Sequence, residues 1–316
     1  MSLSKKLKAH FTILRPFNSV MAGLGVFVGA MSCIGTVDNV YELFIENFIA
    51  LVIAGIACAL ITAGGYVIND YYDRDIDVVN QPQRSIPSGA MSPKEAWFYS
   101  IGLFLAGLII AFFIRNVDPF PFDPFAVFLA FIGVIVVYAY SSDLKRMGII
   151  GNISVSSLTA VPFLYGGVVV QSGERMWVPF FFAFTISMGR EIIKDVEDIE
   201  GDTIGGMRSL PMRIGVKKAT IVGLAWLLIL LLLIPIPFLI QWYFSVSYLV
   251  FVTIIGLIQI FIIYYLNPIK FSESEIIAHS TLCKRLLKTC MFMGIFAFVL
   301  TPFTSINNIL DWLSAL

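Results

Sequence analysis

Long apolar runs separated by short polar segments dominate this chain. A helix that spans a bilayer needs about 20 predominantly apolar residues. Nine segments of this kind follow one another, at about 17–35, 47–68, 96–114, 124–140, 149–170, 177–193, 219–240, 247–266 and 289–305. The pattern predicts an all-α membrane protein, a bundle of nine transmembrane helices forming one integral-membrane domain over residues 1–316. The tail around Trp312 is too short to span, and we expect it to lie at the membrane interface.

Composition supports this class and argues against others. Apolar residues make up 58% of the chain and charged residues 13%, whereas soluble domains carry about 25% charge. The formal net charge is zero, which gives no support to nucleic-acid binding. The four cysteines are scattered without CxxC spacing and are expected to be reduced core residues. The only two histidines lie far apart, so a histidine-based metal site is not expected.

The basic residues predict the orientation in the cell membrane. If the N-terminus is cytoplasmic, 19 of the 21 lysines and arginines fall in cytoplasmic segments or adjoining helix ends. Only Arg115 and Arg175 fall on the other side. This asymmetry predicts a multi-pass protein with a cytoplasmic N-terminus.

Two short acidic segments repeat one another along the chain. Asn69–Asp77 follows the second span and Lys194–Asp202 follows the sixth, and each carries aspartates four residues apart. The two pairs are offset by 125 residues, and an Arg-Ser-(Ile/Leu)-Pro stretch follows each segment. Four spans separate the two segments, so both lie on the cytoplasmic face. We therefore predict a parallel four-helix internal repeat, with halves at about 17–145 and 149–270 and a ninth helix beyond them.

The acidic spacing has a chemical meaning. Residues four apart share one helix face, so Asn69, Asp73 and Asp77 should form one polar stripe. Asp198 and Asp202, with Asp195 one turn earlier, should form another. Oxygen ligands without His or Cys favour Mg²⁺ or Ca²⁺, and Mg²⁺ shares its ligands between carboxylates and substrate phosphates. The ordinary alternative is a charged membrane-surface loop, but duplication at one spacing favours two metal sites that clamp a diphosphate.

Basic and polar residues near the same face complete the predicted site. Guanidinium groups bind phosphate in bidentate fashion and ammonium groups act as point charges. The candidate substrate contacts are Arg15, Asn18, Asn69, Arg84, Tyr140, Lys145, Arg146, Asn152, Arg190, Lys194 and Arg208. For the basic residues the alternative is a topology signal, and for Asn152 it is a hydrogen bond between helices. Tyr140 stands out among the aromatics because its ring could shield a carbocation.

These motifs resemble those of a known family. Asn69-Asp70-x-x-Asp73-x-x-x-Asp77, Asp198-x-x-x-Asp202 and the entry Leu-Arg-Pro-x-Asn at 14–18 are similar to the signatures of the UbiA superfamily of intramembrane prenyltransferases. Within it, residues 80–89 and 189–202 most resemble the archaeal digeranylgeranylglyceryl phosphate synthases. The resemblance implies a helical bundle around a central cavity and Mg²⁺-dependent transfer of a polyprenyl group from its diphosphate to a lipid acceptor.

The resemblance also assigns roles and leaves acceptors open. It implies that Asp73, Asp77, Asp198 and Asp202 are catalytic metal ligands, with Asn69 and Asp195 beside them. The expected acceptor is geranylgeranylglyceryl phosphate; the alternatives are an aromatic acceptor such as 4-hydroxybenzoate, a haem or a tetrapyrrole. A transporter is disfavoured because the charges lie at helix ends and the repeat is parallel. A structural scaffold is disfavoured because charge in a membrane without a use is costly.

Overall fold

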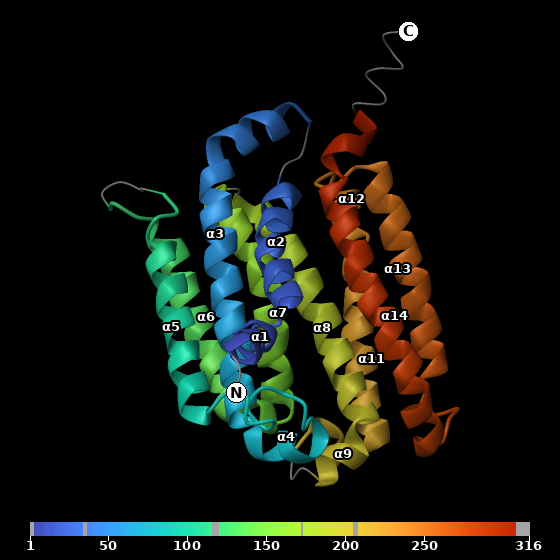
Figure 1. Ribbon diagram of the computed structural model, residues 1–316. Helices are drawn as coiled ribbons and strands as arrows, with labels where there is room; N and C mark the ends of the chain where they lie inside the picture. Colours follow the sequence, from blue (N-terminus) through green and yellow to red (C-terminus); the bar gives the residue numbers. More distant parts are fainter. Residues whose placement is uncertain (1–2, 34–36, 116–119, 172, 205–207, 308–316) are drawn as a thin grey trace.

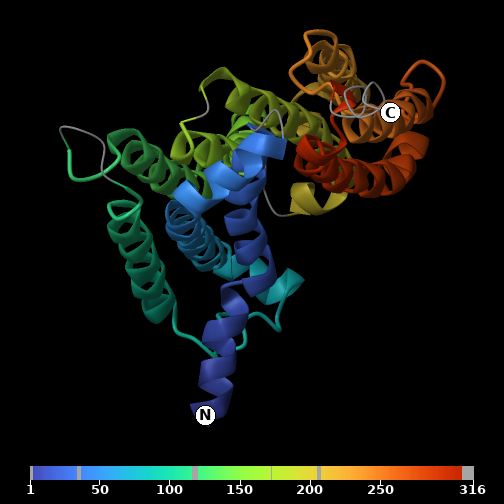
Figure 2. The same cartoon turned by 90° about the horizontal axis from the view of Figure 1, so that it is seen from above.

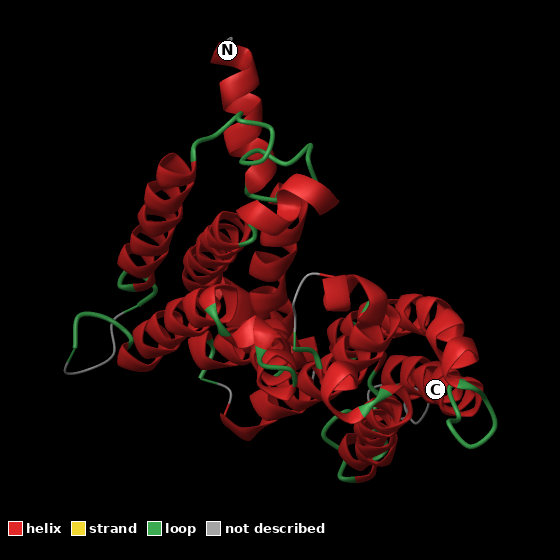
Figure 3. Cartoon of the chain, turned by 90° about the horizontal axis from the view of Figure 1, so that it is seen from below, coloured by secondary structure: helices red, strands yellow, loops and turns green. Residues whose placement is uncertain are grey.

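The computed structural model describes residues 3–33, 37–115, 120–171, 173–204 and 208–307, with only the backbone described at 3–5, 37–45, 79–80, 173 and 202–204. Within these ranges the chain is helical (Figure 3). The long helices are α2 (Pro16–Ser32), α3 (Val37–Tyr72), α5 (Pro93–Ala111), α6 (Pro124–Ser142), α7 (Ile149–Val169), α8 (Trp177–Glu197), α11 (Val216–Leu233), α13 (Val246–Tyr265) and α14 (Glu273–Val299). The short ones are α1 (Leu3–Ile13), α4 (Arg74–Asn80), α9 (Ile199–Ile204), α10 (Leu210–Ile214) and α12 (Ile236–Leu239).

Eight helical segments in the described residues are long and apolar enough to cross a membrane, and they match the first eight predicted spans. The ninth predicted span belongs to α14, which begins and ends earlier than predicted. Lys284, Arg285 and Lys288 make α14 more charged than the eight, so a ninth crossing stays a prediction. The internal repeat also stays a prediction. The predicted tail around Trp312 lies outside the described residues.

Several helices begin at residues whose side chains cap the helix N-terminus. Ser92 accepts a hydrogen bond from the Glu95 amide, and Asp123 accepts from two amides of the first turn of α6. A proline at the first helical position follows both, where its missing N–H costs nothing. At α14, Ser272 and Glu275 form a reciprocal capping box. These local signals place the helix ends on which the bundle depends.

The apolar faces of the helices bury two large clusters and one small one. One large cluster is made mainly by α2, α3, α5, α6 and α7, and the other mainly by α8, α11, α13 and α14. The small cluster joins α1, α3 and α5 with the segment after α4. Helix α7 packs closely against both α2 and α8 and so joins the two groups. Figure 1 shows α4 and α9 together at one end of the bundle, which is also the end where α1 lies. The two acidic segments are therefore brought to one end, as predicted.

The polypeptide turns sharply before α2. Arg15 has a φ of 46° in the left-handed region and precedes Pro16, which disfavours an α conformation in the residue before it. This break separates α1 from α2, and α1 projects sideways from the bundle (Figure 2). The Ser85 hydroxyl donates to the Ala9 carbonyl at 3.1 Å and ties α1 to the segment after α4. The predicted first span is thus preceded by a separate helix.

Candidate active site

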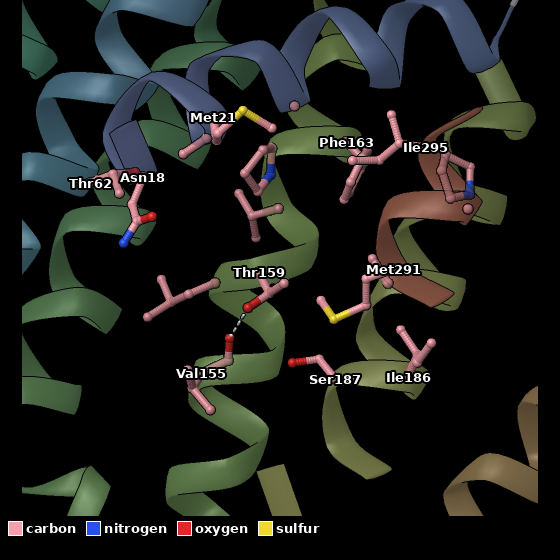
Figure 4. Close-up of a pocket in the computed structure, with 18 of the residues that line it drawn as sticks. Asn18, Met21, Thr62, Val155, Thr159, Phe163, Ile186, Ser187, Met291 and Ile295 are labelled. Atoms are coloured by element: carbon pink, nitrogen blue, oxygen red, sulfur yellow. Dashed lines mark hydrogen bonds between the residues drawn. The ribbon is translucent and has the colours of Figure 1, made fainter. Parts of the chain in front are cut away.

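A cavity of about 680 Å³ lies inside the bundle, lined mainly by α2, α3, α6, α7, α8 and α14. Most of its lining is apolar. Figure 4 shows that side chains from α2, α7, α8 and α14 point into the same space, among them Met21, Phe163, Ile186, Met291 and Ile295. Towards the end nearest α4 and α9 the lining becomes polar and charged, and this part comprises Arg15, Asn69, Tyr140, Arg190 and Glu191. The cavity is therefore apolar along its length and charged at one end.

The first acidic segment starts where α3 ends. Asp73 caps α4, and its carboxylate accepts a hydrogen bond from the Asn69 side chain at 2.8 Å. Lys145, from the turn after α6, forms an ion pair with Asp73 and donates to Asn69 Oδ1 at 3.2 Å. Burial lowers the pKa of Lys145, while the Asp73 carboxylate acts in the opposite direction. Asn69, Asp73 and Lys145 thus form one polar cluster, as their predicted roles require.

Asp77 lies one turn beyond Asp73 and has a different basic partner. The Asp73 amide donates to the Asn69 carbonyl at 2.9 Å and the Asp77 amide to the Asp73 carbonyl at 2.8 Å, so helical spacing continues from α3 into α4. Asp77 pairs with Arg84 at 2.7 Å. The Arg84 guanidinium also contacts Asp70 at 3.3 Å, and Asp70 contacts Arg15 at 2.9 Å. Asp70 was not among the predicted site residues, although it lies within the motif. Arg84 here neutralises two buried carboxylates.

The second acidic segment belongs to α8 and its C-terminal end. Asn152 of α7 donates to the Asp195 carboxylate at 3.0 Å, which is a hydrogen bond between helices. Lys194 pairs with Asp198 at 3.3 Å, and both side chains are about two-fifths exposed. The Asp202 side chain lies outside the described residues. The structure therefore describes Asp195 and Asp198 at the end of α8, each with a polar partner.

Tyr140 connects the two segments. Its side chain lines the cavity near the end of α6. It interacts electrostatically with Asp73 from the first segment and with Glu191 and Asp195 from the second. The two acidic segments, 125 residues apart in the chain, therefore face one polar space.

Arg190 and Glu191 lie at the boundary between the polar space and the apolar cavity. The Arg190 guanidinium pairs with the neighbouring Glu191, while its buried Nε–H has no hydrogen-bond partner among the residues that the structure describes. An unpaired buried donor is costly, and such a group usually serves a ligand or an ordered water. Arg190 is therefore well placed to bind an anion in the cavity.

The donor set fits Mg²⁺. The Asn69 carbonyl and the Asp73 carboxylate both contact the ammonium group of Lys145, so their oxygens converge on one cation. Among the side chains that the structure describes, no three Asp, Glu, His or Cys groups gather as a metal site. Mg²⁺ is commonly held by one or two carboxylates plus substrate phosphates, so a smaller protein set is sufficient. The residues present are the hard oxygen ligands that this ion prefers.

Not every predicted contact reaches the cavity. Arg15, Asn18, Asn69, Tyr140 and Arg190 line it. Arg146 and Arg208 are exposed and do not line it; the Arg208 carbonyl instead accepts from the Arg213 side chain at 3.0 Å. Sequence reasoning missed Asp70 and Lys288. Asp70 lies within the first acidic motif, whereas Lys288 flanks the last predicted span and was explained there by topology alone.

Comparison with known proteins identifies the family. The model of the UbiA prenyltransferase family matches residues 20–278. The chain belongs to the UbiA prenyltransferase family. Curated relatives in this family include digeranylgeranylglyceryl phosphate synthases. That of Thermococcus kodakarensis is 38% identical over 69% of this chain and 73% of its own. That of Saccharolobus solfataricus is 32% identical over 93% of this chain and 96% of its own.

Solved structures of UbiA proteins share the fold. A structure of digeranylgeranylglyceryl phosphate synthase covers 94% of this chain and 98% of its own, with a TM-score of 0.78 and 27% identity. A UbiA homologue from Archaeoglobus fulgidus, bound to DMAPP and Mg²⁺, covers 91% of this chain and 99% of its own, with a TM-score of 0.64 and 20% identity. As a UbiA family member, this chain is a multi-pass membrane prenyltransferase with the helical bundle described above.

Proposed function

We propose that this UbiA protein transfers a geranylgeranyl group from its diphosphate to geranylgeranylglyceryl phosphate in an Mg²⁺-dependent reaction. The product would be digeranylgeranylglyceryl phosphate, a precursor of archaeal membrane lipids. The relatives named digeranylgeranylglyceryl phosphate synthase support this choice of acceptor. The observation that carries the proposal is the cavity, which is largely apolar and carries Asn69, Tyr140 and Arg190 in its lining. Tyr140 interacts with carboxylates of both acidic segments, which lie together at one end of the bundle (Figure 1).

The cavity has the properties that a prenyl diphosphate requires. Its volume of about 680 Å³ falls in the range of small-molecule sites, roughly 300–1,000 Å³. Methionine, phenylalanine and isoleucine side chains line the part that would hold the hydrocarbon chain. The charged end would hold the diphosphate, because the polar head and the apolar tail then each meet a matching environment.

The oxygen ligands of the two acidic segments support an assignment of two metal sites. Asp73 and Asn69 would hold one Mg²⁺, with Asp77 in the same segment; Asp198 and Asp195, with Asp202, would hold a second. When bound, Mg²⁺ stabilises the negative charge of the departing diphosphate. The fold is known with DMAPP and Mg²⁺ in the A. fulgidus homologue, which is consistent with this assignment.

The protein's own side chains would bind the phosphate groups, orient the reacting carbon and shield it from water. Lys145, which pairs with Asp73, would contact oxygens of the diphosphate, and Arg190 adds positive charge at the same end of the cavity. The Tyr140 ring would face the allylic carbon as the bond to the diphosphate breaks, where it favours positive charge. The apolar walls exclude water, which would otherwise capture the allylic cation.

The bond changes are simple. The carbon–oxygen bond to the diphosphate breaks, and an ether bond forms between the allylic carbon and the acceptor hydroxyl. The hydroxyl proton leaves to the released diphosphate or to a nearby group. No redox partner is needed.

Product analysis tests the proposal. Purified protein receives geranylgeranyl diphosphate and Mg²⁺, with geranylgeranylglyceryl phosphate in one reaction and 4-hydroxybenzoate in another. We expect a diether phosphate by mass spectrometry, absent when EDTA is added. Prenylated hydroxybenzoate alone would keep the family chemistry but replace the acceptor. Turnover that persists in EDTA would contradict the metal assignment.

A matched pair of variants tests the acidic site. We expect Asp73→Asn and Asp198→Asn to lower turnover at least a hundredfold, because each removes a charged ligand. Asp75→Asn is the control, since the Asp75 carboxylate is in the same segment but 85% exposed. All three should elute from a sizing column like the unmodified protein. Near-normal turnover in Asp73→Asn would contradict the assigned role.

The proposed orientation needs its own experiment. We infer that α1, α4 and α9 face the cytoplasm, from the distribution of basic residues. Single cysteines replacing Arg146 and Arg115, in a background without native cysteines, should react differently with a membrane-impermeant maleimide. In whole cells we expect labelling at position 115 and protection at position 146; the reverse pattern would invert the topology.

A further inference from the structure

One cation of the cavity differs from the others. Arg15, Arg190 and Lys288 all line the cavity. Arg15 pairs with Asp70, and Arg190 pairs with Glu191. Lys288 is exposed and forms no ion pair or hydrogen bond with any other residue whose side chain the structure describes. A cation on the wall of a largely apolar cavity, without an acidic partner, calls for an anionic ligand.

The position of Lys288 is set by contacts at its own helix. One turn earlier on α14, Lys284 pairs with Glu197 of α8, and Thr281 donates to the same carboxylate at 2.9 Å. Lys284 and Lys288 are four residues apart and so lie on the same face of α14. The face continues with Met291, which points into the cavity (Figure 4). The contact with Glu197 therefore holds Lys288 at the cavity wall.

The same contact places Lys288 near the reacting end. Distances along the two helices can be counted from the end of the bundle that holds α9. At a rise of about 1.5 Å per residue, Lys288 lies about 6 Å further from this end along α14 than Lys284. Arg190 lies about 10 Å further from it along α8 than Glu197. Because Lys284 and Glu197 are in contact, Lys288 stands at a level between Glu197 and Arg190. Arg190 offers its unpaired Nε–H at this level.

The acceptor proposed above has an anion that suits this position. In geranylgeranylglyceryl phosphate, the hydroxyl to be alkylated is on the glycerol carbon next to the one that bears the phosphate. The phosphate must therefore lie within a few bonds of the reacting oxygen, at the border of the polar end. Lys288 is exposed while it lines the cavity, so its ammonium group is accessible to a ligand there.

We propose that Lys288, together with the Arg190 side chain, binds the phosphate monoester of the lipid acceptor and so selects a phosphorylated glycerol ether. The prenyl diphosphate would sit across the cavity, beside Asp73 and Lys145. This inference rests on the proposed function. A lysine that only reaches for lipid headgroups at the membrane surface would be the competing explanation.

Kinetics of three variants test the inference. Lys288→Gln removes the charge, Lys288→Arg keeps it, and Arg285→Gln removes an exposed charge of the same helix that does not line the cavity. Each is assayed with geranylgeranylglyceryl phosphate and with geranylgeranylglycerol, which lacks the phosphate. A lost charge-assisted contact corresponds to about tenfold or more in binding.

We expect Lys288→Gln to raise the KM for the phosphorylated acceptor about tenfold or more, with an unchanged KM for geranylgeranyl diphosphate. Lys288→Arg and Arg285→Gln should resemble the unmodified protein, and the phosphate-free acceptor should not distinguish any of them. The inference is overturned if Lys288→Gln behaves like Arg285→Gln, or if it loses as much with geranylgeranylglycerol. If the unmodified protein alkylates only hydroxybenzoate, the proposed function fails as well, so the two failures are distinguishable.

Discussion

The crossing of α2 and α7 offers a sharp test of how the cavity is held in shape. Gly166 of α7 lies against the backbone of α2, and a Cβ atom built there would stand 1.8 Å from the Val26 carbonyl oxygen. On the other helix, a Cβ at Gly29 would stand 2.0 Å from the Phe163 carbonyl oxygen. Real Cβ atoms essentially never come closer than 3.0 Å. Gly166→Ala must therefore push the two helices apart by more than 1 Å.

The expected cost follows from this displacement. Forcing extra methylenes into a packed interior costs about 1–3 kcal/mol, and the rigid backbone oxygen here puts Gly166→Ala at the upper end or above it. Gly102→Ala in α5 is the matched control, because outside the adjacent backbone of its own helix no described atom lies within 4 Å of its Cβ position. Alanine forms helix better than glycine by about 1 kcal/mol, so this control should be neutral or stabilising. The same substitution thus has opposite expected signs at the two sites.

The assay is unfolding in mixed detergent micelles with increasing SDS, followed by tryptophan fluorescence. We expect the midpoint to fall for Gly166→Ala and to stay or rise for Gly102→Ala. At SDS concentrations below the unfolding midpoint, where the variant is still folded, the turnover of Gly166→Ala should also be lower. The displaced helices position Arg15, which directly precedes α2, and Asn152 of α7. Equal stability and activity of the two variants would refute the close crossing and the cavity shape that depends on it.

Two other substitutions probe the charged end and the apolar end. Arg84→Met leaves Asp70 and Asp77 without a shared guanidinium, so we expect a loss of about 3 kcal/mol in the same unfolding assay. Arg74→Met, whose side chain is over one-third exposed, should change stability by at most about 0.5 kcal/mol; equal losses would contradict this. Gly133→Leu projects a side chain into open space of the cavity wall, so the KM for geranylgeranyl diphosphate should rise more than that for geranyl diphosphate. An unchanged ratio of the two KM values would contradict the assignment of the apolar lining to the prenyl chain.

The acidic site was predicted in part from sequence. Spacing and duplication placed Asp73 and Asp198 at equivalent helix ends, and both lie at the same end of the bundle. Helical spacing also predicted that Asp77 would share a face with Asp73, and i→i+4 backbone hydrogen bonds do link Asn69, Asp73 and Asp77 in turn. The spacing did not show that Asp73 would pair with Lys145 and Asp77 with Arg84. Local periodicity carries no information about such partners from elsewhere in the chain.

Partners distant in the chain required the tertiary structure. Lys145 reaches Asp73 across 72 residues, and Glu197 reaches Lys284 from α8 to α14. Both lysines were visible in the sequence, but a basic residue at a membrane surface is equally explained by topology. Only the packing of the helices shows which basic residues meet an acid, and that Lys288 lines the cavity without an acidic partner among the described side chains.

The sequence by itself determined the membrane class, the first eight spans and the family, because each depends on properties that are local along the chain. Apolar length decides whether a segment can cross a bilayer, and the acidic motifs are contiguous. The cavity, and the basic partners that Asp73 and Asp77 each meet, were decided by the tertiary structure. Those features depend on how closely helices approach one another, and that distance is set by pairs such as Gly29 and Phe163 that lie far apart in the sequence.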